Sequence, residues 1–99
     1  MSTEDCSKIL KAIADTTRLK ILRHLIAGEK TVSELCQDLH IEQTSMSHHL
    51  AVLRKSKVVM EFRQGRQVVN RICPNFAKAL SSTERRMDLG CCAVELRTE

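Results

Sequence analysis

The sequence predicts a mainly helical protein with one small two-stranded hairpin. Apolar residues recur at helical spacing through most of residues 5–55, residues 58–72 alternate between apolar and polar types, and Gly65 interrupts that alternation. The chain has 99 residues, of which 42% are hydrophobic, and this suits one globular domain. We therefore expect a single domain over residues 1–99 with about five helices and a two-stranded hairpin.

Two helices are predicted in the first 30 residues. Cys6, Ile9 and Ile13 share one face of a helix over residues 5–13. Asp15 is a good N-cap for a second helix, and Gly28 is a good terminator for it. The apolar stripe of this second helix is wide, which indicates that the helix lies in the core.

A pair of short helices joined by a tight turn follows. The Thr-Val-Ser-Glu run at residues 31–34 is a capping box, which predicts the start of a third helix. A fourth helix is predicted over residues 43–55, because Met46, Leu50 and Leu53 fall at helical spacing and define a buried face. The opposite face is polar and carries Gln43, Thr44, Ser47 and His48.

The hairpin and a last helix complete the prediction. Residues 58–63 and 67–72 are the expected strands, and Gln64-Gly65 is the expected turn because Gly tolerates positive φ. Pro74 is expected to start a last helix that Gly90 ends. Phe76, Leu80, Thr83 and Met87 would form a narrow seam on it, suited to a partner helix in a dimer. Residues 91–99 would then form a short tail that carries Cys91 and Cys92.

Two helices, a tight turn and a basic hairpin form a winged helix-turn-helix, a shape that fits the major groove of DNA with one arm beside it. Residues 54–71 hold six basic side chains against one acid, Glu61, although the net charge of the chain is only +4. Aromatic residues make up 2% of the chain, too few to stack single-stranded bases. Double-stranded DNA is therefore the expected nucleic-acid partner.

Several other classes of protein are not expected. The sequence has no nucleophile motif, Gly-rich phosphate loop or metal-hydrolase spacing, which argues against an enzyme and against an organic cofactor. Residues 1–20 lack the apolar region of a signal peptide, and no apolar run approaches the length of a membrane span, so we expect a cytoplasmic protein with no membrane partner. In that compartment, the five cysteines are expected to be buried hydrophobes, metal ligands or redox thiols rather than structural disulfides.

Three motifs, AIADTTRLKILRHL, SMSHHLAVLR and FRQGRQVV, occur in this order between Ile9 and Pro74. In these motifs the chain resembles the ArsR/SmtB (arsenic-repressor) family of winged-helix transcriptional repressors. The resemblance implies a homodimer whose first and last helices form the interface. It also implies two recognition helices in successive major grooves of a palindromic operator, and release of the DNA when an inducer binds.

The positions with which this family reads DNA fall on the polar face already described and on the hairpin. Gln43 is suited to bidentate pairing with adenine, while Thr44, Ser47 and His48 offer single hydrogen bonds. His49 falls toward the buried side and is expected to pack or cap rather than read a base. The arginines of the wing are expected to grip phosphates or the minor groove. The wing positions are Arg63, Gln64 and Arg66.

The arsenic site best known in the family is broken here. It needs three cysteines on the third helix, and the matching positions are Thr31, Ser33 and Cys36, so only the last thiol remains. The family's zinc site in the last helix also lacks its ligands, since no His lies beyond residue 49.

The adjacent thiols of Cys91 and Cys92 are the remaining candidates, because paired thiolates bind soft ions such as arsenite. If the last helices pair antiparallel in a dimer, Cys73 of one subunit approaches them as a third ligand. Cys6 with Cys36 is a second candidate pair.

Three functions remain open. The first is a repressor that leaves its operator when arsenite or another soft metal ion binds Cys91, Cys92 and Cys73. The second is a redox- or persulfide-responsive repressor on the same fold. The third is a DNA-binding module that responds to no ligand.

Overall fold

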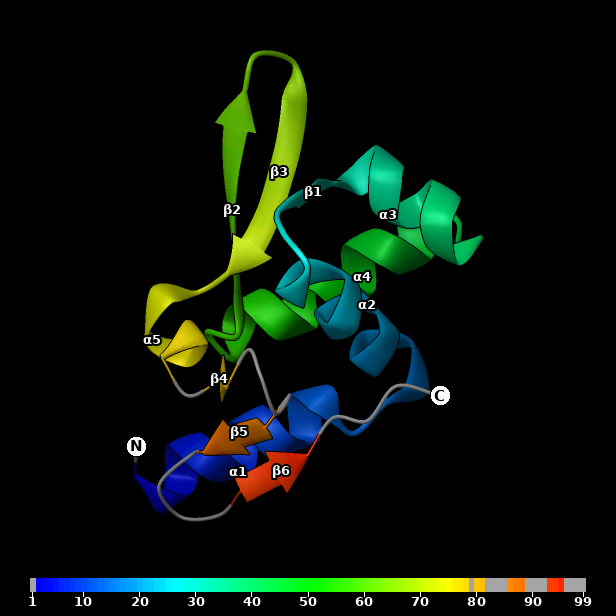
Figure 1. Cartoon of the computed structure of the whole chain (residues 1–99). Helices are drawn as coiled ribbons and strands as arrows, with labels where there is room; N and C mark the ends of the chain where they lie inside the picture. Colours follow the sequence, from blue (N-terminus) through cyan, green and yellow to red (C-terminus); the bar gives the residue numbers. More distant parts are fainter. Residues whose placement is uncertain (1, 79, 82–85, 89–92, 96–99) are drawn as a thin grey trace.

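The chain folds into a cluster of helices from which a two-stranded hairpin projects (Figure 1). The computed structural model describes residues 2–78, 80–81, 86–88 and 93–95, with side chains placed up to residue 78. Within these residues, no helix is long and apolar enough to span a membrane. The helices are α1 (Thr3–Ile13), α2 (Thr16–Ile26), α3 (Val32–Leu39), α4 (Gln43–Lys55) and α5 (Pro74–Ala77).

Local sequence signals account for where the first helices begin. Ser2 caps α1 and Asp15 caps α2, each accepting a hydrogen bond from the backbone N–H three residues on. The predicted capping box of α3 is present in full, since Thr31 and Glu34 bond each other's backbone N–H groups. The predicted bounds of α4 are confirmed, whereas α1 starts two residues before the predicted residue 5.

The hairpin is built from β2 (Val59–Gln64) and β3 (Gln67–Ile72), which pair antiparallel. Gln64 pairs with Gln67, so the turn consists of Gly65 and Arg66, one residue later than predicted. The φ of Gly65 is 65°, a value that glycine adopts without strain and that a two-residue turn of this kind requires. A short strand that the sequence did not reveal, β1 (Lys30–Thr31), pairs with β3 and gives the order β1-β3-β2.

The core lies where α1, α2, α3 and α4 meet the base of the hairpin. Leu22, Leu35, Met46, Leu50 and Leu53 are each at most 1% exposed, so α4 buries the face that its periodicity predicted. Phe76 of α5 is 1% exposed and closes this core from the side of the hairpin's end. Helix α4 is therefore held by packing on its inner face along most of its length.

The predicted last helix over residues 74–90 is wrong. Helix α5 ends at Ala77, and β4 (Leu80–Ser81), β5 (Arg86–Asp88) and β6 (Ala93–Glu95) form a second antiparallel sheet in the order β4-β5-β6. The run Ser81-Ser82-Thr83 has weak helix propensity, and the narrow apolar seam needed a partner helix that a single chain does not supply. The helix pairing that would carry Cys73 to a partner's tail thus has no counterpart in the described residues.

Candidate nucleic-acid interface

The outer face of α4 presents a continuous set of hydrogen-bonding side chains. Met46 and Leu50 are buried beneath it, at 0% and 1% exposure, and fix which way the helix faces. The four predicted reading residues are all exposed, and His49 beside them is half-buried, as predicted. The structure thus brings the four together on one face, and their contact with bases stays a prediction. They are Gln43, Thr44, Ser47 and His48.

The turn between α3 and α4 sets how this face is presented. His40 ends α3 with φ 53° and ψ 48°, the left-handed conformation that commonly terminates a helix. Glu42 precedes α4 without making a side-chain cap, so the first backbone N–H groups of α4 have no capping side chain. Amides in this position, at the positive end of the helix dipole, are suited to an anion such as a DNA phosphate.

The three predicted wing residues are exposed on the hairpin, and their contact with DNA stays a prediction. Arg63 and Gln64 end strand β2, Arg66 lies in the turn, and all three are exposed. Among the described residues, neither arginine takes part in an ion pair. Their guanidinium groups are therefore available for an external anion.

Two other basic residues of this region are already engaged. Arg54 of α4 forms an ion pair with Glu61 of β2, with Nη1 and Oε2 3.1 Å apart. Arg71 of β3 lies over the ring of Phe62, with its guanidinium carbon 5.5 Å from the ring centroid. The basic side chains of residues 54–71 therefore differ in their surroundings, and the ion pair of Arg54 with Glu61 links α4 to β2.

A polar cluster of Asp15, Arg18 and His49 lies behind α4 and was not predicted from the sequence. Arg18 of α2 lies with Nη1 3.3 Å from Nδ1 of His49, and its backbone N–H donates to Asp15. That backbone hydrogen bond is the main cause of a lowered pKa of Asp15; burial opposes it, and the charges of Arg18 and His49 add to it. His49 follows Arg18 by 31 residues, so no local pattern in the sequence could reveal the contact.

The predicted thiol site is described only in part. Cys91 and Cys92 lie outside the described residues. Within the described residues, no group of three side chains is placed to hold a metal ion. Cys73 immediately precedes α5, is half-buried and is a free thiol. Burial raises the pKa of Cys73, against a smaller lowering by the guanidinium of Arg71.

The other two cysteines also differ from one another. Cys36 is a free, half-buried thiol that packs against the core. Cys6 is 2% exposed and is disulfide-bonded, although structural disulfides were not expected from the sequence. Cys36 is therefore not the disulfide partner of Cys6, and the candidate ion-binding pair of Cys6 with Cys36 stays a prediction.

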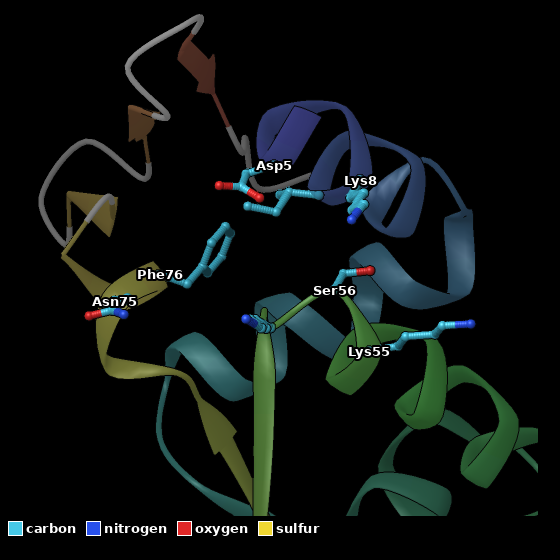
Figure 2. A pocket seen from close by; sticks show the side chains of 8 residues that line it. Asp5, Lys8, Lys55, Ser56, Asn75 and Phe76 are labelled. Atoms are coloured by element: carbon cyan, nitrogen blue, oxygen red, sulfur yellow. The ribbon is translucent and has the colours of Figure 1, made fainter. Parts of the chain in front are cut away.

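A hollow of about 300 Å³ lies at the C-terminal end of α4, away from the reading residues (Figure 2). Asp5 and Lys8 approach it from α1, Lys55 and Ser56 from the end of α4, and Phe76 from α5. No cysteine is among the described residues that line it, and ammonium groups outnumber the carboxylate. It therefore offers no ligand set for a soft metal ion.

The known proteins that this chain resembles are bacterial transcriptional regulators. Residues 15–61 match the family described as "Bacterial regulatory protein, arsR family". The transcriptional repressor SdpR of Bacillus subtilis is 37% identical over 59 residues, which cover 60% of this chain and 66% of SdpR. The arsenical resistance operon repressor of Escherichia coli is 39% identical over 69 residues, which cover 69% of this chain and 59% of the repressor. The chain thus spans less than two thirds of the length of each of these two relatives.

Longer matches extend the likeness to about three quarters of this chain. The transcriptional activator HlyU of Vibrio cholerae is 33% identical over 79 residues, which cover 80% of this chain and 73% of HlyU. The structure of its reduced form matches with a TM-score of 0.72 and 32% identity, over 78% of this chain and 81% of that chain. A homodimeric winged helix-turn-helix DNA-binding domain, Mb0332 of Mycobacterium bovis, matches with a TM-score of 0.70 and 28% identity, over 73% of this chain and 67% of that chain.

Proposed function

Because the chain belongs to the ArsR family of bacterial transcriptional regulators, we propose that it is a repressor that binds an operator as a homodimer and leaves it when a thiophilic inducer binds. Proteins of this family regulate transcription and are not enzymes. The observation that carries the DNA-binding part is the arrangement of α4, whose inner face is buried while Gln43, Thr44, Ser47 and His48 stay exposed. The wing adds two arginines that form no ion pair with any described residue.

The roles of these residues follow from their chemistry. Gln43 and its three neighbours would hydrogen-bond base edges in the major groove, which sets the sequence that is read. Arg63 and Arg66, with Gln64 between them, would contact the backbone beside that groove and raise affinity for any duplex. A homodimer would place two such surfaces on one palindromic operator, as implied by the homodimeric relative Mb0332.

For the inducer we propose arsenite or another soft metal ion, bound through the thiolates of Cys91, Cys92 and Cys73. The adjacent thiols in the sequence support this, as does the similarity to the arsenical resistance operon repressor of Escherichia coli. Cys73 is free and half-buried, and since its pKa is raised, ion binding has to displace a proton there. The proposal places the protein in the cytoplasm, where thiols are kept reduced, so it concerns the chain after the disulfide at Cys6 is reduced.

The test follows ion binding and DNA release in one titration. The fully reduced chain is bound to a fluorescent duplex recovered by in vitro selection from random DNA, and arsenite is added while thiolate absorbance and anisotropy are recorded. We expect both signals to change at the same arsenite concentration. Cys91→Ser should abolish both changes without weakening DNA binding, and Cys36→Ser, a free cysteine outside the proposed site, should leave them intact. A normal response of Cys91→Ser would contradict the site, and release without a change in absorbance would contradict thiolate binding.

A second candidate inducer is an oxidant or persulfide, and the disulfide at Cys6 is the observation that favours it. Mass spectrometry of the protein after persulfide and after arsenite separates the two. A sulfur bridge at Cys6 together with DNA release by persulfide alone would favour redox sensing. DNA affinity that is unchanged by metals, oxidants and reductants would instead identify a module without a ligand.

The direction of regulation is a separate part of the proposal. SdpR is named a repressor and HlyU an activator, so the relatives differ on this point. A reporter gene behind the selected operator should be silenced by the chain and restored by the inducer. An increase in expression when the chain is added would show activation instead.

A further inference from the structure

Arg18 joins three helices through one side chain. Its guanidinium Nε donates a hydrogen bond to the backbone carbonyl of Ala12 at the end of α1, and its Nη1 lies 3.3 Å from Nδ1 of His49 in α4. Its backbone N–H is held by the N-cap of α2, Asp15, at 3.0 Å. The side chain of Arg18 thus links α4 to both α1 and α2.

The contact with His49 requires one protonation state. A guanidinium only donates hydrogen bonds, so this contact is a hydrogen bond only while Nδ1 of His49 carries no proton. A carboxylate oxygen of Asp15 lies 3.9 Å from the same Nδ1. Protonation at Nδ1 would remove the acceptor for Arg18, create a repulsion between two cations, and favour a new bond to Asp15.

Among the described residues, the charged or titratable groups that contact the His49 ring come from α2 and from α4 itself. Asp15 and Arg18 approach it from α2, and the ring of His48 packs edge-on at 5.9 Å between centroids on α4 itself. The side chain of His49 is only 20% exposed, so little water is present to screen these interactions. His48 is one of the proposed reading residues. A movement of the His49 ring would therefore displace a side chain of the proposed DNA-binding face.

We propose that Arg18 and His49 are positioning residues for the recognition helix, and that protonation of His49 releases this support and weakens operator binding. The inference rests on the proposed DNA binding and not on the identity of the inducer. Imidazole is the side-chain group that most readily exchanges a proton near neutral pH, so acidification is the perturbation that tests this contact. The loss should be on the order of tenfold, the size expected for one hydrogen bond to a charged group.

The test measures affinity for the selected duplex by anisotropy at constant ionic strength, from about pH 8 to about pH 5.5. Wild type should lose affinity on acidification. His49→Asn, whose amide oxygen can accept from Arg18 without taking up a proton, should bind as tightly as wild type near pH 8 and should not lose affinity on acidification. His24→Asn is the matched control, since its ring contacts the Lys20 carbonyl of its own helix, and should keep the wild-type profile. His48→Asn isolates the contribution of His48 itself. A protonated His48 ring would attract DNA phosphates and raise affinity on acidification, opposite to the effect expected of His49.

A second readout needs no DNA and keeps failure of the two proposals distinct. Nitrogen-15 spectra of the free protein should show His49 protonated only at Nε2 near neutral pH, and the Arg18 side-chain signals should shift together with the titration of His49. An Nδ1–H tautomer, or Arg18 signals that ignore His49, would overturn the positioning role even if DNA binding is confirmed. A wild-type affinity that is flat or rises on acidification, or a His49→Asn variant with the wild-type slope, would overturn it as well. Failure of the chain to select any duplex would overturn the proposed function itself.

Discussion

Replacing Arg66 by glutamine should lower the salt dependence of DNA binding by a calculable amount. Arg66 lies exposed in the turn of the wing and has no ion-pair partner among the described residues. Each phosphate contact contributes about 0.9 to the slope of log affinity against log salt concentration, so one contact in each of two subunits contributes about 1.8. Between about 50 and about 200 mM salt, that slope corresponds to about a twelvefold loss of affinity that the variant would no longer show.

The assay is a series of anisotropy titrations on the selected duplex at several salt concentrations. Arg71→Gln is the matched control, because Arg71 lies over Phe62 on strand β3 and should leave the slope unchanged. Circular dichroism of both variants checks that the fold is retained. A wild-type slope for Arg66→Gln, or an equal reduction for Arg71→Gln, would refute the assignment of the wing contacts.

Three further predictions concern the framework behind this surface. Thr31→Ala removes the capping box of α3 and should lower the free energy of unfolding by about 1 kcal/mol in urea denaturation, whereas Ser33→Ala at an exposed position should change it by less than about 0.5 kcal/mol; equal effects would contradict the cap. Leu50→Ala at 1% exposure should cost about 2–5 kcal/mol in the same assay, and a cost below about 1 kcal/mol would contradict the packing of α4. Asp15 and Glu34 have pKa values held below their ordinary 3.8 and 4.5 mainly by backbone hydrogen bonds, so their contribution is full above those values and is lost as the pH falls below them; unfolding midpoints that do not move in that acid range would contradict this.

Local rules were enough to predict the recognition helix and its surroundings. The N-cap at Asp15, the capping box at Thr31 and the buried spacing of Leu50 each depend on residues within a few positions of one another, and the structure confirms all three. The conformational freedom of glycine correctly predicted Gly65 in the turn of the hairpin, although the turn lies one residue later than expected. These features position the proposed reading face, which is why that face could be located without a structure.

Features that depend on distant partners were not predictable in the same way. Strand β1 has two residues, too few for any periodicity, and exists because β3 offers it a free edge. Contact between Arg18 and His49 depends on how α2 packs against α4. The predicted last helix is wrong for a related reason. Its apolar face beyond Phe76 is narrow, and only packing against a second chain would stabilise it as a helix.

Sequence-specific binding by the outer face of α4 is measured most directly by comparing the wild type and Gln43→Ala on the selected duplex and on a scrambled one. We expect the recovered duplex to be an inverted repeat that the wild type binds at least about 10³-fold more tightly than the scrambled sequence. Gln43→Ala should lose at least about tenfold of affinity on the repeat and almost none on the scrambled duplex. An equal loss on both duplexes, or no enrichment of any sequence in the selection, would contradict the reading role of this helix.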